Sequence, residues 1–134
     1  MIFLDILQSN TKNMIYKSLD YLWQKQRIIS ENIANIDTPG YKAKYVTFED
    51  ELRKSLADVA DMSGNATKSE IKNAIEGTRM NIQDTQNEVV RLDGNNVNID
   101  TENTELARTQ IQYQTLVELL ARDQRMRSVI RDAR

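Results

Sequence analysis

The sequence predicts a mainly α-helical chain, in which two long terminal amphipathic helices pair as a coiled coil around a short irregular or extended middle. Near each end, apolar residues recur at spacings close to three and four, the period of one helix face. Between the ends the sequence turns polar and carries its single proline. We therefore expect a helical coiled-coil domain, 1–36 with 95–134, and a middle, 37–94, that holds a turn, an extended segment and a flexible region.

The first long helix is expected from about Lys12 to Asn35, after a short apolar N-terminal patch and a polar stretch. At 1.5 Å per residue it would span roughly 36 Å. Its apolar stripe is narrower than the face of a helix packed on a globular core and is typical of a coiled-coil seam, with Trp23 on its flank. The predicted seam residues are Ile15, Leu19, Leu22, Ile29, Ile33 and Ile36.

A fixed turn is expected to follow this helix. Pro39 cannot continue a helix, and Pro39-Gly40 suits the two central positions of a type II turn, the second of which needs a positive φ. The side-chain amides of Asn32 and Asn35 can bond the last helical backbone groups or each other. The signature of helix, amide-rich stop and turn consists of Asn32, Asn35, Thr38, Pro39, Gly40 and Tyr41.

The middle of the chain has weaker patterns. Residues 41–48 alternate aromatic and polar side chains loosely and are expected to be extended. Residues 48–56 predict a short helix, with Thr47 as its N-cap and acids in its first turn. Residues 57–88 are small and polar in part, and their isolated apolar residues support no clear period. We expect a loop or mobile insertion there, with short helical or strand fragments.

The second long helix follows an Asp-Gly turn at 93–94. Val97 and Ile99 would share one face of an extended segment, and Asp100 or Thr101 would cap the helix. Its roughly thirty residues would span about 45 Å. The main predicted stripe is Leu106, Tyr113, Leu116, Val117, Leu120 and Ile130, widened by Ile111, Leu119, Met126 and Val129. We expect Leu106, Tyr113, Leu116, Val117 and Leu120 to pack against the first seam, within a subunit or between neighbours.

Composition excludes several classes of function. The chain has no histidine and no cysteine, which removes the commonest general base, the commonest metal ligand and all thiol chemistry. Its net charge of −2 is too small to indicate nucleic acid or a charged membrane surface. No apolar run approaches the ~18 residues of a membrane helix, and the N-terminus lacks signal-peptide features. We expect no enzyme, no cofactor, no metal and no membrane insertion.

Two groups of residues could be interpreted as a catalytic site or a metal site, but a structural role explains each of them better. Acidic residues gather where the first turns of helices are expected, so we interpret them as solvated helix starts rather than catalytic carboxylate pairs. The segment 93–105 faintly resembles a calcium loop. However, Val97, Asn98 and Thr104 stand where that loop needs an oxygen ligand, a glycine and a glutamate. We therefore expect a turn leading to a helix cap.

Two segments carry a resemblance to a known family. Residues 32–41, Asn-Ile-Ala-Asn followed by Thr-Pro-Gly-Tyr, resemble the N-terminal signature of bacterial flagellar rod and hook proteins. Residues 93–100 and the pattern after them resemble the C-terminal region of proximal rod subunits. The resemblance covers roughly 1–50 and 89–130. It departs at Ile36-Asp37, where many relatives have Ala-Asn, but Asp37 keeps a short polar side chain able to bond the turn.

The resemblance implies a structural subunit of the flagellar basal-body rod, exported unfolded through the flagellar type III apparatus without a cleaved signal. Such subunits polymerise with other rod proteins near the MS-ring and the export-gate adaptor. Their terminal helices form the inner coiled-coil layer of a drive shaft that transmits torque. From the residues alone, two alternatives stay open: an ordinary small helical bundle, and a helical adaptor or export-chaperone-like binding module that forms a discrete dimer.

Overall fold

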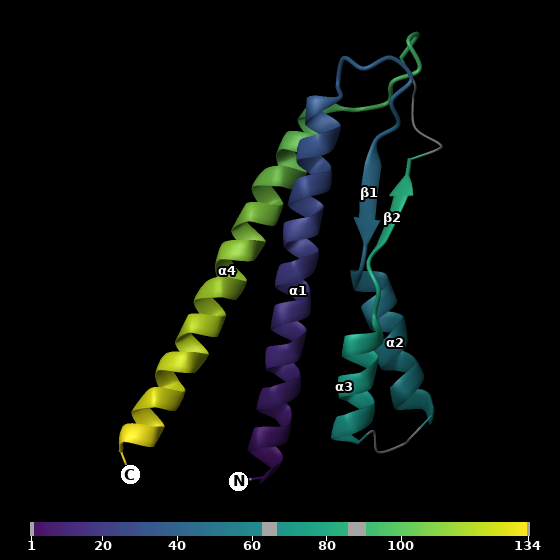
Figure 1. Cartoon of the computed structure of the whole chain (residues 1–134). Coiled ribbons are helices and arrows are strands. Elements are labelled where there is room, and N and C mark those ends of the chain that lie inside the picture. Colours follow the sequence, from purple (N-terminus) through teal and green to yellow (C-terminus); the bar gives the residue numbers. More distant parts are fainter. Residues whose placement is uncertain (1, 63–66, 86–90, 134) are drawn as a thin grey trace.

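The computed structural model of the chain describes residues 2–62, 67–85 and 91–133. Two long helices lie side by side and antiparallel, with both chain ends at the same end of the molecule, and the shorter elements stand along the other side of the first helix (Figure 1). This arrangement confirms the mainly α fold class with paired terminal helices. In chain order the elements are α1 (Ile2–Ala34), β1 (Lys44–Thr47), α2 (Glu49–Met62), α3 (Lys68–Gly77), β2 (Asn81–Asp84) and α4 (Ile99–Asp132).

The first helix is longer than predicted. It begins at Ile2 rather than near Lys12, because the polar stretch between these positions contains neither proline nor glycine and so nothing in it stops a helix. The 33 residues of α1 span about 50 Å. The predicted end is confirmed, since α1 stops at Ala34. The backbone amide of Asn35 still donates to the Glu31 carbonyl at 3.1 Å.

The buried face of α1 is also wider than the predicted narrow seam. Tyr21 and Ile28 are buried although neither belongs to the predicted stripe. The reason is that α1 packs against α4 and also against α3 and β1, so it buries more than a two-helix seam would require. The rings of Tyr21 and Phe48 stack with centroids 5.1 Å apart. The core cluster comprises Tyr21, Leu22, Val46, Phe48, Leu52 and Ile75, with Leu56, Ile71 and Leu116 packed against it.

Over 57–88 the structure has the short helical and strand fragments that we expected, in place of a loop, in the described part of that segment, 57–62 and 67–85. The helix α2 continues to Met62, and α3 and β2 follow. A capping box starts α3, in which the Thr67 hydroxyl accepts from the Glu70 amide and the Glu70 carboxylate accepts from the Thr67 amide. The buried Ile75 then fastens α3 to the core. The four exposed residues of β2 carry no apolar pattern, so pairing with β1 rather than local preference makes them a strand.

The expected extended segment at 41–48 is confirmed in β1, which pairs antiparallel with β2. The predicted N-cap is wrong, because Thr47 is the last residue of β1 and its hydroxyl donates to the Asn81 carbonyl at 3.4 Å. The helix α2 begins one residue after Phe48. Phe48 is therefore placed at the helix start by its burial in the core, and not by a capping side chain.

Two side chains of α1 hold the ends of α3. The Lys17 ammonium donates to the carbonyls of Glu76 and Thr78 at 3.1 and 3.3 Å, where the last carbonyls of a helix favour a cation. At the other end, the Asn10 amide donates to the Lys68 carbonyl at 3.4 Å. These bonds fix the position of α3 along α1.

The last helix starts earlier than predicted. Asn98 is its N-cap, and its side-chain oxygen accepts from the amides of Asp100 and Thr101 at 3.0 and 3.3 Å. The predicted caps, Asp100 and Thr101, therefore lie inside the first turn. The prediction that Val97 and Ile99 share one face of an extended segment is wrong, because Ile99 is the exposed first residue of α4 whereas Val97 is buried before it. Asparagine is among the strongest capping residues, which explains the earlier start.

Truncating a buried side chain of α3 tests whether this segment is packed. Ile75 is 2% exposed, so Ile75→Ala should lower the free energy of unfolding of the chain by about 2–5 kcal/mol in urea titration. The same change at the exposed Ile82 of β2 is the matched control and should cost within about 0.5 kcal/mol. Equal, small effects at both positions would contradict the packing of α3 on α1.

Candidate functional site

The turn after α1 meets the segment before α4 at the upper end of the molecule (Figure 1). The contact is made largely by four asparagine side chains, and we call it the amide junction. Two of these side chains were predicted in the turn signature and two follow the Asp-Gly turn at 93–94. The amide junction consists of Asn32, Asn35, Asn95 and Asn96.

The side chain of Asn32 bonds the edge of β1 in the place where a neighbouring strand would bond it. Its amide nitrogen donates to the Lys44 carbonyl at 2.8 Å, and its oxygen accepts from the Lys44 amide at 2.9 Å. The Tyr41 hydroxyl donates to the same oxygen at 3.2 Å. With 1% of its surface exposed, Asn32 satisfies both backbone groups of a residue twelve positions ahead, which a buried strand edge requires. Of the two asparagines predicted to bond the last helical turn, Asn35 does so, since its side-chain amide donates to the Glu31 carbonyl at 2.8 Å.

Asn95 binds the end of α1 from the other half of the chain. Its side chain is fully buried, and its amide nitrogen donates to the carbonyls of Asn35 and Thr38, both at 2.9 Å. Its side-chain oxygen accepts from the Val97 amide at 2.8 Å. Both N–H groups are used, and one of them satisfies a carbonyl that the helix end leaves without an intrahelical partner. Asn95 therefore joins α1 to the segment that leads into α4.

The expected turn at 38–41 is confirmed and packs directly on the second turn. Gly40 has φ +73°, and the Tyr41 amide bonds the Thr38 carbonyl at 3.3 Å, as in a type II turn. The Gly40 amide donates to the Asp93 carbonyl at 2.8 Å. Gly94 also has a positive φ, and a Cβ added to it would lie 3.3 Å from the Gly40 Cα. The two glycines thus let two turns touch backbone to backbone.

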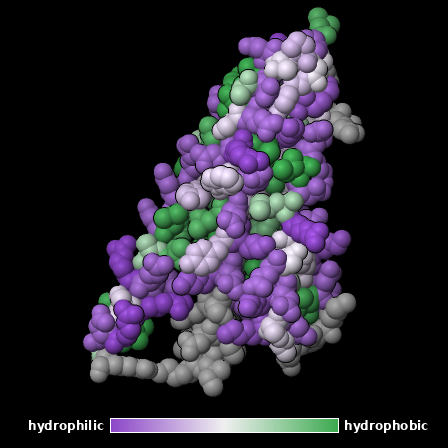
Figure 2. Space-filling model, viewed as in Figure 1, coloured by the Kyte–Doolittle hydropathy of each residue, from purple (hydrophilic) through white to green (hydrophobic). Residues whose placement is uncertain are grey.

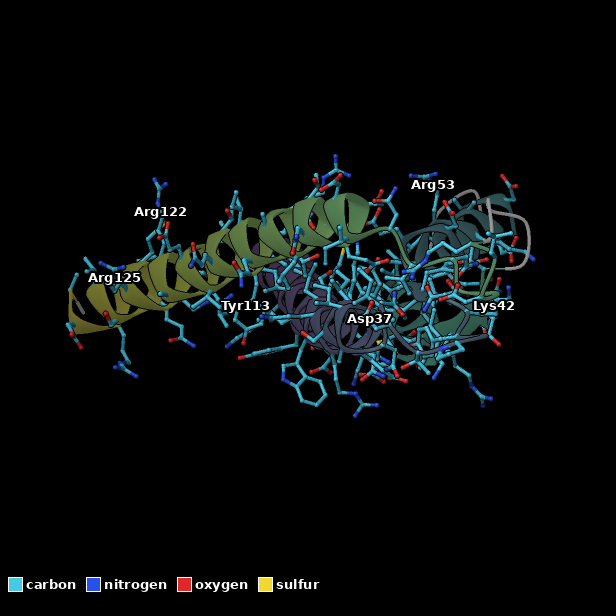
Figure 3. The ribbon with its side chains drawn as sticks, turned by 90° about the horizontal axis from the view of Figure 1, so that it is seen from above. Asp37, Lys42, Arg53, Tyr113, Arg122 and Arg125 are labelled. Atoms are coloured by element: carbon cyan, nitrogen blue, oxygen red, sulfur yellow. The ribbon has the colours of Figure 1, made fainter. Side chains whose placement is uncertain are left out.

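Further hydrogen bonds link the amide junction to the residues just before β1 and just after β2. The Ala43 amide donates to the Asn96 side-chain oxygen at 2.6 Å, and the Asn96 amide donates to the Thr85 carbonyl at 2.9 Å. The Lys42 ammonium donates to the Gly94 carbonyl at 2.6 Å. Figure 3 looks down on this end and places Lys42 on the side of the molecule away from α4. Our sequence prediction missed Asn95 and Asn96; the run of asparagines after an Asp-Gly turn was the available signal.

The predicted seam residues are distributed unequally. In α1, Ile15, Leu22 and Ile29 are buried and Leu19 and Ile33 are half-buried. Ile36 is half-buried but lies in the turn after α1 ends at Ala34, so its prediction as a residue of the helical seam is wrong. On α4, Leu106, Leu116 and Leu120 are half-buried, whereas Tyr113 and Val117 are exposed. Leu22 and Leu116 also belong to the core formed with α2 and β1. The detailed pairing of the two seams stays a prediction, and two of its residues, Tyr113 and Val117, are 37% and 41% exposed within the chain.

The two long helices lie closest near the junction and diverge toward the chain ends (Figure 1). Near the junction the Lys25 ammonium and the Glu105 carboxylate form an ion pair at 2.9 Å. The hydrogen bond from Lys25 holds the pKa of Glu105 below its usual range. Figure 2 shows apolar and polar residues interspersed over the face seen in Figure 1. Exposed apolar residues continue down α4: Ile111, Tyr113, Val117, Leu119, Met126, Val129 and Ile130.

In the described part of the chain, no group of three or more acidic side chains is placed to hold a metal ion. None of the described helices combines the length and apolarity that crossing a bilayer requires. A groove of about 600 Å³ runs between α1, α2 and α4, lined by core residues such as Leu22, Phe48 and Leu116. The prominent features of the described surface are thus exposed helix faces and a groove between helices.

An elongated helical chain with apolar residues exposed along α4 carries the kind of surface through which protein chains associate. Residues 22–42, which contain the end of α1 and the turn, match the family model described as flagella basal body rod protein. Curated relatives match over most of the chain. The flagellar basal body rod protein FlgB of Bacillus subtilis (strain 168) is 40% identical over 97 residues, 70% of this chain and 71% of that protein.

Two other FlgB proteins show the same likeness. That of Borreliella burgdorferi is 33% identical over 113 residues, 79% of this chain and 84% of its own length. That of Escherichia coli (strain K12) is 31% identical over 111 residues, 78% and 80% respectively. The chain belongs to the FlgB family of flagellar basal body rod proteins, which confirms the resemblance seen in its two signature segments.

Replacing the junction amide by a carboxylate should destabilise the chain. In Asn95→Asp, carboxylate oxygens would face the carbonyls of Asn35 and Thr38 in place of N–H donors. We expect a loss of about 1–3 kcal/mol in the free energy of unfolding at pH 7, measured by urea titration. Asn98→Asp is the matched control and should be nearly neutral, because this exposed N-cap only accepts hydrogen bonds.

The loss in Asn95→Asp should depend on pH. Burial against carbonyls raises the pKa of the new carboxyl in the folded state above its unfolded value near 3.9. The protonated form can donate one bond, so stability should recover as pH falls through the folded pKa. A loss that is independent of pH would contradict this account of the site.

The contribution of the Lys25–Glu105 ion pair to stability should depend on pH in the opposite direction, decreasing at low pH. Because the pKa of Glu105 is lowered in the folded chain, the pair stabilises the fold above the unfolded pKa. That contribution is lost as pH falls through the folded value. In Lys25→Gln the pKa of Glu105, measured by carboxyl NMR, should rise toward its ordinary value, while the same substitution at the exposed Lys54 should leave it unchanged. An unchanged titration of Glu105 in Lys25→Gln would show that the two helices do not meet there.

Proposed function

We propose that this chain is a structural subunit of the proximal rod, which polymerises with its own copies and with other rod proteins into the shaft that transmits torque. Membership of the FlgB family supports the basal-body rod as its place of action. The observation that carries polymerisation is the exposure of apolar residues along α4, from Ile111 to Ile130. Contiguous apolar surface of this kind marks sites of protein association.

Assembly would complete the burial that the single chain leaves undone. Tyr113 and Val117 were predicted to pack in the seam, yet both are exposed within the chain. Burying a side chain of this kind contributes about 1.5–3 kcal/mol, and the gain repeats in every copy of a polymer. Helices packed laterally over many such contacts would resist twisting, which suits a shaft under torque.

We assign a different structural role to each of the two parts of the chain. Residues 1–36 and 95–134 would form the inner helical layer, and residues 37–94 would lie outside it. The amide junction joins these parts, with Asn32 and Asn95 bonded across the turn. It would therefore set the direction in which the chain leaves the inner layer, as a structural and not a catalytic device.

The partners follow from the same proposal. The chain would be exported by the flagellar type III apparatus without a cleaved signal and would contact the MS-ring and the export-gate adaptor at the base of the rod. A chain without cysteine forms no disulfide that would hinder its passage in an unfolded state. Its site of action would be the cell envelope, in the basal body.

A charge placed in the exposed seam should block assembly and leave the fold intact. Val117 is 41% exposed, so Val117→Asp should unfold in urea like the parent chain. In cells that lack the parent gene, this variant should be absent from isolated basal bodies and the cells should not swim. Gln114→Asp, at an exposed polar position of α4, is the control and should assemble.

Normal motility with Val117→Asp present in basal bodies would contradict a role of this seam in the polymer. A different result would favour the adaptor or chaperone-like module. In that case the parent chain would form a compact dimer of fixed size in sedimentation and would be missing from purified rods.

A further inference from the structure

The face of α1 that points away from the rest of the chain is aromatic and charged. Four residues at helical spacing form it, and we call them the α1 ridge: Tyr16, Asp20, Trp23 and Arg27. Trp23 is 57% exposed, and the Arg27 guanidinium lies 5.9 Å from the centroid of its ring. At 3.6 residues per turn, the α1 ridge lies about half a turn from the face that buries Tyr21 and Leu22. Indole and guanidinium groups are typical anchors of protein interfaces.

A second apolar surface lies on α4. The residues that we call the α4 strip line a shallow groove of about 910 Å³. The groove shares Thr115 with the groove between α1, α2 and α4, and so continues it along the helix. Val129 in this strip is 67% exposed. The α4 strip consists of Glu118, Leu119, Arg122, Arg125, Met126 and Val129.

The α1 ridge and the α4 strip open on opposite sides of the chain. The α4 strip continues the groove that is lined by the buried face of α1, including Tyr21 and Leu22, whereas the α1 ridge is the reverse face of that helix. Figure 3 shows Arg122 and Arg125 pointing to the same side of the molecule as Arg53. A copy that presents its α1 ridge to this side would meet the α4 strip.

The charges of the two surfaces match in one direction only. Asp20 and Arg27 are seven residues apart, and so are Glu118 and Arg125, a spacing of about 10.5 Å on each helix. An antiparallel contact places Asp20 opposite Arg125 and Arg27 opposite Glu118. A parallel contact would oppose like charges at both places, which is unfavourable.

The same register matches the apolar groups. With Asp20 opposite Arg125, counting along the two helices in opposite directions places Tyr16 opposite Val129 and Trp23 opposite Arg122. Leu119 and Met126 then flank the indole ring. An arginine and aliphatic side chains around an exposed indole provide both cation–π and apolar contacts.

We propose that the α1 ridge of one copy docks antiparallel on the α4 strip of the next copy. Because α1 and α4 already run antiparallel within one chain (Figure 1), the incoming copy has the same orientation as the first. Two different surfaces on opposite sides make a head-to-tail contact, which repeats without closing. The inference rests on the proposed rod function and assigns to it one lateral interface.

Disulfide trapping tests this register directly, because the chain contains no cysteine of its own. Tyr16→Cys combined with Val129→Cys should give, in oxidised basal bodies, a ladder of dimers, trimers and larger products on denaturing gels. Tyr16→Cys combined with Gln114→Cys, at an exposed polar position of α4, is the control. It should be incorporated and stay monomeric, because Gln114 is fifteen residues from the matching position, about 22 Å along α4.

Monomers only from the Tyr16/Val129 pair, with that variant present in basal bodies, would overturn the interface and leave the rod function standing. Absence of the parent chain from basal bodies would overturn the rod function itself. A disulfide to a different protein would remove the second copy as the occupant of the α4 strip.

If the double-cysteine variant is not incorporated into basal bodies, exchanging the charges of Asp20 and Arg125 tests the same interface. Asp20→Arg alone and Arg125→Asp alone should each reduce incorporation into basal bodies, and the two together should restore it. Equal incorporation of both single variants and the double variant would overturn the interface.

Discussion

The arrangement of this chain depends on side-chain amides that hydrogen-bond the backbone of segments far apart in the sequence. Asn32 bonds both backbone groups of Lys44 at the edge of β1, and Asn95 bonds carbonyls at Asn35 and Thr38. Each buried polar group left without a partner would cost about 1–3 kcal/mol. Since these bonds link residues 12 to 60 positions apart, they position α1, β1 and the start of α4 together.

Once the junction is closed, α1 has one packed face and one free face. It contacts α4, α3 and β1, which buries residues such as Tyr21 and Ile28 and leaves Trp23 exposed. The lower half of α4 diverges from α1 (Figure 1), so its apolar residues are not buried by the partner helix. A chain that buried all of its apolar surface internally would gain little from neighbours, whereas this one retains surface for association.

The sequence predicted the features that depend on local patterns. Helical periodicity located α1 and α4, and Pro39-Gly40 predicted a turn that Gly40 adopts with φ +73°. Features set by distant partners were missed: β2 depends on β1 for its pairing, and the partners of Asn95 lie 57 and 60 positions away. The start of α3 was predictable, because Thr67 and Glu70 form a capping box visible in the sequence.

Native-state hydrogen exchange of the full chain tests the central claim, that the amide junction is as stable as the helical core. The backbone amides of Lys44 and Val97 donate to side-chain oxygens, of Asn32 and Asn95 respectively. The account predicts that these amides exchange as slowly as the Leu22 amide in the middle of α1, because all three open only with the whole fold. Exchange of Lys44 and Val97 at the rate of an unfolded chain, while Leu22 stays protected, would contradict it.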